Sequence, residues 1–407
     1  MKNIVIVAPF IGKTMRQCLA AFAGLENTKI GIISQQPEEA LPARLQQRIS
    51  GHMRVSDCLN SEQLTEATHR FNEQWGKVDR LIGYLEHLQT PLAETRTRLN
   101  IDGMQHQQAL NFRDKNQMKD VLRRAGLPVA AQAKIHSAQD AQRFIEEVGY
   151  PIILKPLAGV GSKNTMRVRN ERDLYRALNT LLPAPERPVQ AEQFVRGEEH
   201  TLEAVTINGT TVWQSSTYYL PGPLQVLENP WMQYCVLLPR EQTQPHVRRF
   251  APVNRAALST LGMHTGISHM EWFLQDNQQP IISEVGARPP GVNIMNLMAA
   301  AHEVDIWEKW ARLSVYDEWN MPERKYAVGC AFLRGQGRGN TIRAIEGLEE
   351  AQEKVQGMVV SANLPSVGQL RSEHYEGDGW IIIRHPQTAG AVQGLRVLLQ
   401  TISITLG

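Results

Sequence analysis

Residues 269–291 read HMEWFLQDNQQPIISEVGARPPG, in which two runs rich in apolar residues flank the polar turn 276–279. Runs of this kind on either side of a short stretch of turn residues predict a β-hairpin. If the hairpin is centred on Asn277 and Gln278, its register places Glu271 directly opposite Glu284. Facing side chains in such a pair lie roughly 5 Å apart, and like charges there destabilise the sheet. The pair therefore needs a compensating positive charge.

A divalent cation would supply that charge. Magnesium is bound in proteins by one or two carboxylates together with phosphate oxygens of a nucleotide. Glu271 and Glu284 are therefore candidate metal ligands, with manganese as the alternative ion. Two other interpretations stay open: the glutamates lie exposed on a solvated strand face, or a register slip separates them.

The stretch PIILKPLAGVGSKN, residues 151–164, has features that suit phosphate binding. Lys155 ends an apolar strand, and the loop after it contains Gly159, Gly161 and Ser162. Exposed backbone N–H groups in such a loop bind anionic oxygens. The loop lacks the GxxxxGK[ST] pattern, and a small flexible hairpin is the alternative interpretation. A phosphate-binding loop here is expected to move, because it must admit its ligand and then exclude water.

Two further segments carry charged residues beside predicted elements. Asp114 is a good helix N-cap residue, and Lys115 follows it at the positive end of the helix dipole, an arrangement that favours a nearby anion. The segment AEQFVRGEEHTLE, residues 191–203, combines carboxylates with an apolar Phe-Val pair, which suits recognition of ribose and adenine. In isolation, a surface lysine and an acidic surface strand are the simpler explanations.

Together, these four segments resemble the ATP-grasp superfamily in their order and spacing, over residues 1 to about 300. The resemblance implies an ATP-grasp fold that binds ATP and magnesium. It also implies a role for each matching residue. Lys115 and Lys155 would bind phosphates with Gly159, Gly161 and Ser162; Glu192, Phe194 and Val195 would border adenine; Glu199 would hold the ribose; Glu271 and Glu284 would bind the metal; and Arg288 would stabilise the transferred phosphate.

One position departs from the family pattern. The family commonly has E-x-N-x-R, whereas Gly286 stands here in place of the asparagine that is the usual third metal ligand. The metal stoichiometry is therefore left open. Within the superfamily, EVGARPPG at 284–291 and the C-terminal residues most resemble the L-amino acid ligases and related carboxylate-amine ligases. The loop typical of purine-pathway carboxylases and the biotin-carboxylase glycine tetrad are both absent after Lys155.

The chain as a whole is predicted to form three units of α/β and α+β type. Residues 1–110 alternate apolar runs with amphipathic stretches, which predicts a Rossmann-like parallel-sheet domain, although no GxGxxG fingerprint follows the first strand. The resemblance implies an ATP-grasp domain at 111–320, with a lid subdomain at about 130–195 and a catalytic subdomain at about 196–320. Residues 321–407 are predicted to form a small β-rich C-terminal domain with a closing helix.

Composition fits a multidomain enzyme of 407 residues. Hydrophobic residues make up 42% and charged residues 21%, close to the averages of globular proteins. The net charge of +2 gives no global reason to expect a nucleic-acid or membrane partner. No apolar run reaches the ~18–20 residues that cross a bilayer. Four scattered cysteines predict reduced thiols in a cytoplasmic protein, and a homodimer is left open.

The resemblance implies a ligase that releases ADP, activates a small-molecule carboxylate as an acyl-phosphate and joins it to an amine, with amino acids as candidate substrates. A carboxylase or formate-using ligase is a second enzyme interpretation, and a non-catalytic ATP-binding regulatory module is the alternative from another class. The aromatic residues Tyr218, Tyr219, Trp231 and Tyr234 are candidates for a substrate wall, with ordinary packing as the competing explanation.

Overall fold

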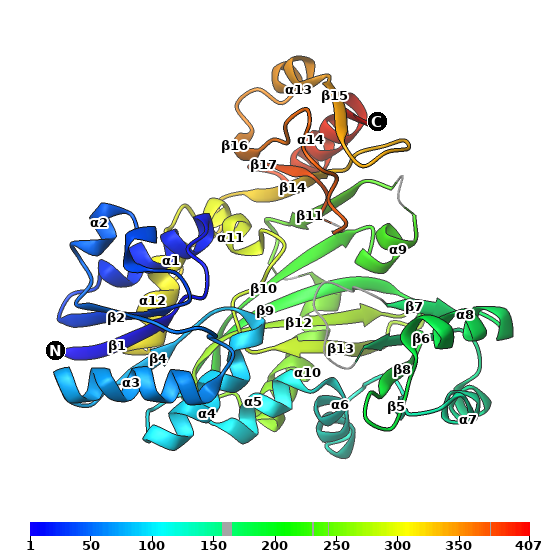
Figure 1. Ribbon diagram of the computed structural model, residues 1–407. Helices are drawn as coiled ribbons and strands as arrows, with labels where there is room; N and C mark the ends of the chain where they lie inside the picture. The colour runs from blue at the N-terminus through cyan, green and yellow to red at the C-terminus, as the bar shows by residue number, and fades with distance from the viewer. Residues whose placement is uncertain (157–164, 230–231, 243, 375) are drawn as a thin grey trace.

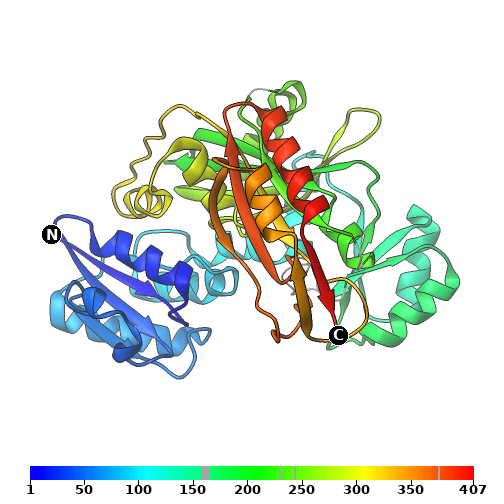
Figure 2. The same ribbon diagram turned by 90° about the horizontal axis from the view of Figure 1, so that it is seen from above.

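The computed structural model describes residues 1–407 except 157–164, 230–231, 243 and 375. Figure 1 shows an N-terminal sheet with helices in blue, a large central sheet in green and yellow, and a C-terminal unit in orange and red above one end of the central sheet. Seen from above in Figure 2, the N-terminal sheet and the smaller teal unit lie on opposite sides of the C-terminal unit.

The N-terminal residues form a four-stranded parallel sheet in the order β3-β2-β1-β4. Its strands are β1 (Lys2–Val7), β2 (Thr28–Ser34), β3 (Gly51–Arg54) and β4 (Arg80–Ile82). The helices around it are α1 (Lys13–Ala23), η1 (Glu38–Ala40), α2 (Ala43–Gln46), α3 (Ser61–Trp75), η2 (Glu86–Leu88) and α4 (Gln89–Leu99). The predicted parallel α/β unit is confirmed, because helices cover the sheet and bury its apolar strands.

Two helices, α5 (His106–Arg113) and α6 (Lys115–Arg124), follow this sheet. Helix α6 begins where the sequence predicts, because the Asp114 carboxylate accepts hydrogen bonds from the backbone N–H groups of Asn116 at 2.9 Å and Gln117 at 3.0 Å. An N-cap of this kind stabilises a helix by roughly 1 kcal/mol. It also fixes the first turn of α6, and with it Lys115.

A small antiparallel sheet follows, with strand order β5-β8-β6-β7. Its elements are β5 (Gln132–Ile135), α7 (Ala138–Val148), β6 (Ile152–Pro156), β7 (Met166–Val168), α8 (Glu171–Leu181) and β8 (Val189–Gln193). Strand β6 matches the apolar strand predicted at Lys155, and the glycine-containing loop connects it to β7. That loop falls in 157–164, so the prediction that it moves lies outside the described residues.

The central sheet has eight strands in the order β13-β12-β9-β10-β11-β14-β17-β16, and all of its neighbouring strands are antiparallel. Its strands are β9 (Glu198–Ile207), β10 (Thr210–Leu220), β11 (Tyr234–Leu238), β12 (Gly266–Leu274), β13 (Pro280–Gly286), β14 (Ala327–Leu333), β16 (Val359–Asn363) and β17 (Gly379–His385). The helices between them are α9 (Pro223–Glu228), α10 (Pro245–Leu261), α11 (Ile294–His302) and α12 (Ile306–Tyr316).

The hairpin of β9 and β10 turns at Asn208 and Gly209. Both residues have positive φ, 51° and 77°. Two-residue hairpin turns of this type need positive φ at both central positions, which asparagine and glycine adopt with little strain. The turn therefore sets the register in which β9 contributes to the central sheet.

The hairpin of β12 and β13 pairs Glu271 with Glu284, which confirms the predicted pair. The predicted centre of the turn, however, was wrong. Next to the turn Leu274 faces Pro280, so the turn is centred on Asn277 alone rather than between two residues. A hairpin that kept this register along its whole length would not bring the two carboxylates together.

A β-bulge between these two regions restores the pairing. Trp272 faces Ile282, whereas its neighbour Glu271 faces Glu284, so Ser283 is an extra residue in β13. Without the bulge Met270 would face Glu284, and the side chains of Glu271 and Glu284 would point to opposite faces of the sheet. Bulges of this kind often re-aim side chains beside active sites.

Aromatic contacts hold the N-terminal sheet against the central part. The ring of Phe22 in α1 meets Trp310 in α12 edge-on at 5.3 Å, and the ring of Tyr84, after β4, lies 5.2 Å from Trp307. Pairs in these geometries contribute about 0.5–1.5 kcal/mol beyond the area they bury. They fix the segment after β4, which includes Glu86, relative to the central sheet.

The C-terminal residues extend the central sheet with β14, β17 and β16 and also form a separate pair, β15 (Ile342–Glu346) with β18 (Ser403–Leu406). Two helices, α13 (Leu348–Lys354) and α14 (Thr388–Thr401), complete this unit. The division into three domains at the predicted boundaries stays a proposal. Within the described part of the chain, every helix is too short or too polar to cross a bilayer.

Candidate active site

A cleft of about 460 Å³ lies where the small sheet, the central sheet and the segment after β4 meet. Nine of the predicted site residues line it: Lys115, Lys155, Glu192, Phe194, Val195, Glu199, Glu271, Glu284 and Arg288. The remaining three, Gly159, Gly161 and Ser162, lie outside the described residues. The structure thus brings together residues that the sequence separates by more than a hundred positions.

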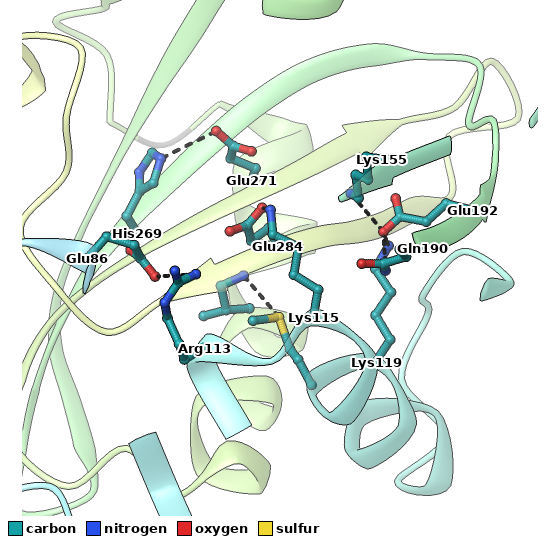
Figure 3. Close-up of polar contacts among 12 residues, drawn as sticks. Glu86, Arg113, Lys115, Lys119, Lys155, Gln190, Glu192, His269, Glu271 and Glu284 are labelled. Carbon is teal, nitrogen blue, oxygen red and sulfur yellow. Dashed lines mark hydrogen bonds and ion pairs between the residues drawn. The ribbon is translucent and has the colours of Figure 1, made fainter. Parts of the chain in front are cut away.

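The two facing glutamates sit beside a lysine. The Lys115 ammonium donates a hydrogen bond to the carboxylate of Glu284 (Figure 3). Burial acts to raise the pKa of Glu284, but Lys115 and then Lys155 outweigh it and lower the pKa to about 2. Glu284 is therefore ionised at every physiological pH. The lysine offsets the repulsion that the sequence predicts between Glu271 and Glu284.

Glu271 is held from its other side by a buried network. Tyr219 donates a hydrogen bond from its hydroxyl to Glu271 Oε1 at 3.2 Å, and His269 Nε2 lies 3.6 Å from the same oxygen. His269 Nδ1 in turn lies 2.9 Å from Glu203, which is fully buried. Burial acts to lower the pKa of His269, but the contacts with Glu203 and Glu271 raise it to about 9. A protonated His269 therefore neutralises part of the charge of this network.

A second charge cluster surrounds Glu192. Lys119 Nζ lies 2.7 Å and Lys155 Nζ 2.8 Å from the same carboxylate oxygen (Figure 3). Burial acts to raise the pKa of Glu192, but the two lysines lower it to about 2. Burial is also the main cause that lowers the pKa of Lys119 to about 8. The Glu192 side chain thus faces the lysines, and its predicted place beside adenine stays a prediction.

Next to this cluster lies the apolar part of the cleft, lined by Phe194, Val195 and Ile153. The guanidinium of Arg167 lies 4.3 Å from the centre of the Phe194 ring, and Arg167 is held by Glu228 at 3.0 Å. A flat apolar surface backed by a fixed cation suits an aromatic base.

Glu199, the predicted ribose ligand, is a carboxylate in a desolvated position. Burial and then the nearby charge of Glu271 raise its pKa to about 8. A Cβ on Gly222 would lie 2.6 Å from Glu199 Oε2, so only a glycine leaves room for the carboxylate in this position. Glu199 therefore carries a proton over much of the physiological pH range, and a neutral carboxyl group can both donate and accept hydrogen bonds.

Arg288 lies just beyond the end of β13 and contacts a residue of the N-terminal unit. Its Nε donates a hydrogen bond to the carboxylate of Glu86, and its Nη1 donates to the carbonyl oxygen of Pro289 at 2.8 Å. Arg113 lies 3.8 Å from the other oxygen of Glu86. A Cβ added to Gly286 would lie 3.6 Å from Glu86, so Glu86 borders the space that a side chain at position 286 would fill.

A family model for the ATP-grasp domain matches residues 120–301. The chain contains an ATP-grasp domain. Two curated relatives are an uncharacterized protein, y4rH, of Sinorhizobium fredii and the L-arginine-specific L-amino acid ligase of Bacillus subtilis. The first is 26% identical over 58% of this chain and 49% of the relative, and the second is 24% identical over 68% of this chain and 67% of the relative. The chain thus spans about half to two thirds of their length.

Solved structures agree with the ATP-grasp fold. The L-amino acid ligase from Bacillus licheniformis has a TM-score of 0.78 at 20% identity, with 100% of this chain and 99% of that chain covered. The carboxyaminoimidazole ribonucleotide synthase from Aspergillus clavatus, solved in complex with ATP, has a TM-score of 0.71 at 16% identity, with 98% of each chain covered. The similarity extends over the N-terminal and C-terminal units, so the fold prediction is confirmed along the whole chain.

In the ATP-grasp domain, the donor set fits magnesium. Glu271 and Glu284 offer two neighbouring carboxylates, and a lysine ammonium already occupies a cation position beside them. Among the described residues, His, Cys, Asp and Glu side chains form no metal-binding group of three or more. Magnesium keeps several waters or phosphate oxygens as ligands, so two carboxylates and a nucleotide suffice. These glutamates would hold the ion.

Sequence reasoning missed several residues that the structure places at this site. Lys119 follows Lys115 by one helical turn, and His269 precedes Glu271 by two residues on the same face of a strand. These spacings could have identified Lys119 and His269 from the sequence as neighbours of the predicted site residues. Glu203 and Glu86 had no such signal, because only the tertiary fold brings them to His269 and Arg288.

The candidate substrate wall is only partly present in the cleft. Tyr219 lines it, whereas Tyr234 is buried and stacked on Phe332 at 5.1 Å. Tyr218 lies 3.0 Å from His246 Nε2 and is absent from the cleft lining. Trp231 lies outside the described residues. Ordinary packing therefore accounts for Tyr218 and Tyr234.

Proposed function

We propose that this protein is an ATP-dependent carboxylate-amine ligase that releases ADP and phosphate. The observation that carries the proposal is one cleft that holds a carboxylate pair, Glu271 and Glu284, together with Lys115, Lys155 and Arg288. Binding of adenosine alone would need neither a metal-binding pair nor an arginine for a transferred phosphate. The similarity to the L-amino acid ligases supports the same reading.

In the proposed complex, adenine lies against Phe194 and Val195, and the ribose hydroxyls contact Glu199. The triphosphate extends to Lys155 and Lys115, so Lys115 leaves Glu284 and contacts a phosphate oxygen. Magnesium, held by Glu271 and Glu284, would neutralise charge on the phosphates. The ion pair of Lys115 with Glu284 thus keeps both groups in place until the nucleotide arrives.

The first step of the proposed reaction is phosphoryl transfer. An oxygen of the substrate carboxylate attacks the γ-phosphorus, the bond from this phosphorus to the β,γ-bridging oxygen breaks, and ADP leaves with the electron pair. Arg288, fixed by Glu86, offers two planar N–H donors to oxygens of the transferred group. This transfer depends on positioning and charge, and it needs no protein nucleophile.

The second step forms the amide. The nitrogen lone pair of a neutral amine attacks the acyl carbon of the acyl-phosphate, the bond from this carbon to the phosphate oxygen breaks, and inorganic phosphate leaves with the electrons. The nitrogen then loses a proton to solvent. Positive charge in the cleft stabilises the departing phosphate as it did the ADP.

A product assay tests the proposal. Purified protein is incubated with magnesium and ATP and with amino acids supplied singly and in pairs, and ADP, AMP and phosphate are quantified. Amino-acid-dependent ADP and phosphate in equal amounts, with a new amide, is the expected result. AMP and pyrophosphate would overturn the acyl-phosphate mechanism. ADP release that requires bicarbonate or formate would replace the amine ligase with a carboxylase or formate-using ligase.

We also propose a cytoplasmic location. All four cysteines are buried and free. Burial raises the pKa of both Cys58 and Cys235 to about 12, so these thiols are protonated and poorly reactive. Recovery of the protein from an extracellular or membrane fraction with oxidised cysteines would contradict this location.

A further inference from the structure

One wall of the cleft contains none of the residues assigned above to ATP. It is formed by the segment between β16 and β17, drawn in orange in Figure 1, which contributes His374 and Glu376. Leu224 and Val292 line the cleft with them. These residues share the cleft with Arg288, where the carboxylate of the substrate is proposed to react. The wall is therefore placed to contact the rest of the substrate.

Hydrogen bonds fix this segment in position. The buried carboxylate of Asp378 accepts hydrogen bonds from the backbone N–H groups of Gly335 at 2.9 Å and Ser372 at 2.6 Å. Arg334 donates to the carbonyl oxygen of His374 at 3.3 Å. Because these contacts tie the segment to the end of β14, His374 and Glu376 are presented to the cleft from a pre-organised backbone.

The turn directly after Glu376 depends on a glycine. Gly377 has φ +70°, and a Cβ there would lie 2.5 Å from the carbonyl oxygen of Leu333. Its N–H donates to the carbonyl oxygen of His374 at 3.0 Å, which closes the turn. No side chain fits at position 377, so the backbone that carries Glu376 is sterically defined.

Glu376 brings a carboxylate to the cleft from the segment between β16 and β17. Burial raises its pKa, and nearby His374 opposes this shift only in part. Among the described residues Glu376 forms no ion pair. In contrast, each of the following carboxylates of the cleft contacts a basic side chain: Glu86, Glu192, Glu271 and Glu284. Glu199 also forms no ion pair among the described residues, but the proposed complex assigns it to the neutral ribose hydroxyls.

We propose that Glu376 binds a positively charged nitrogen of the carboxylate substrate, so that the molecule activated by ATP is an amino acid. This inference rests on the proposed ligase function. A partly buried carboxylate is stabilised when a ligand brings the opposite charge, and Arg288 supplies a cation for the acidic end of the same ligand. The cleft thus offers one charge for each end of an amino acid.

The nitrogen that Glu376 binds differs from the nitrogen that forms the amide. A nucleophilic amine must be neutral when it attacks, whereas a carboxylate beside it favours the protonated form. Glu376 therefore holds the ammonium group of the activated amino acid, and the amine enters separately. The bound cation is either the α-ammonium group or a side-chain cation, and these two sources are separated by the choice of substrate.

The first test measures binding without turnover. A calorimetric titration of the full-length protein, with magnesium and a non-hydrolysable ATP analogue, uses amino acids, their deamino analogues and amino acids with cationic side chains. Binding of an amino acid at least tenfold tighter than its deamino analogue is expected if the α-ammonium group is bound. A preference limited to lysine or arginine assigns the side-chain cation. Equal binding of amino acids and their uncharged analogues would overturn the inference.

The second test uses Glu376→Gln, which removes the charge and keeps the shape. Glu373→Gln is the matched control, because Glu373 is exposed on the same segment and absent from the cleft lining. We expect Glu376→Gln to weaken amino acid binding and raise its KM by about 10–100-fold, as for a lost charged hydrogen bond. The KM for ATP and the use of a deamino carboxylate should stay within about twofold of the unsubstituted protein.

The two tests separate the inference from the function on which it rests. An unsubstituted protein that binds amino acids through Glu376 but releases no ADP would contradict the ligase and leave the binding site standing. An active ligase whose KM for the amino acid is unchanged in Glu376→Gln would contradict the binding site and leave the ligase standing.

Discussion

Arg288 is fixed by Glu86, a residue 202 positions earlier in the chain, through a hydrogen bond from Nε to the carboxylate. Arg113 approaches the same carboxylate, at 3.8 Å, from the end of α5. Gly286 leaves the space that Glu86 borders, and a Cβ there would lie 3.6 Å from its carboxylate. Gly286 therefore lies beside a contact between the N-terminal unit and the residue that follows β13.

The first prediction concerns this contact. Glu86→Gln should lower kcat by about 10–100-fold with little change in the KM for ATP, because Arg288 loses its charged partner and its fixed orientation. Steady-state kinetics of ADP release measure both constants. Glu66→Gln is the matched control, since Glu66 pairs with Arg70 at 3.0 Å on an exposed helix face, where such pairs contribute little. Equal kcat values for Glu86→Gln and the control would refute a positioning role.

The second prediction concerns Lys119, of whose side chain only 1% is exposed. Lys119→Met removes one of the two lysines that neutralise buried Glu192, so the free energy of unfolding should fall by about 2–4 kcal/mol. Urea denaturation measures this change. Lys134→Met, at an exposed position of β5, should lie within about 0.5 kcal/mol of the unsubstituted protein. A Lys119→Met protein as stable as that control would show that Lys155 alone neutralises Glu192.

The third prediction concerns pH. The folded-state pKa of Glu199, about 8, lies above its ordinary value of 4.5. Between these values the unfolded chain loses this proton while the folded chain keeps it, so Glu199 makes the protein less stable as pH rises. Glu199→Gln removes this contribution. The free energy of unfolding of Glu199→Gln minus that of the unsubstituted protein should therefore be larger at pH 8 than at pH 5, by roughly 1–3 kcal/mol. If the two proteins differ in free energy of unfolding by the same amount at pH 5 and at pH 8, the raised pKa of Glu199 is contradicted.

The fourth prediction separates catalysis from nucleotide binding. Glu284→Gln should lower turnover by about 100-fold or more and raise the magnesium concentration needed for half-maximal rate, because the carboxylate holds the ion. The affinity for adenosine should stay within about threefold, since the adenine and ribose contacts lie elsewhere. Glu349→Gln, exposed on α13, is the control. An unchanged magnesium dependence in Glu284→Gln would remove this residue from the metal site.

The sequence selected nine residues that line one cleft, because the signals for them are local. A strand ending at Lys155, an N-cap at Asp114 and a hairpin carrying two glutamates each depend on neighbouring residues. The pairing of Glu271 with Glu284 was predicted correctly from an incorrect turn, since the bulge at Ser283 compensates for a shift of one residue. Alternation along a strand cannot reveal such a bulge, because it depends on packing against the neighbouring strand.

The residues that were missed depend on contacts between distant parts of the chain. Glu86 reaches Arg288 only because aromatic packing places the N-terminal sheet against α12. Glu203 reaches His269 across paired strands, and Glu376 reaches the cleft from the C-terminal unit. Glu86 and Glu376 lie in segments without a distinctive pattern. Glu203 ends the segment 191–203, whose pattern indicates ribose and adenine contacts and not a contact with His269.

The central claim is that ATP activates a carboxylate as an acyl-phosphate, and transfer of an oxygen isotope tests it most directly. An amino acid that supports ADP release is labelled with ¹⁸O in its carboxylate and incubated with the protein, magnesium, ATP and an amine acceptor, and the products are analysed by mass spectrometry. The account predicts one ¹⁸O atom in each inorganic phosphate released with ADP. Phosphate without the label, or label recovered in AMP, would contradict it.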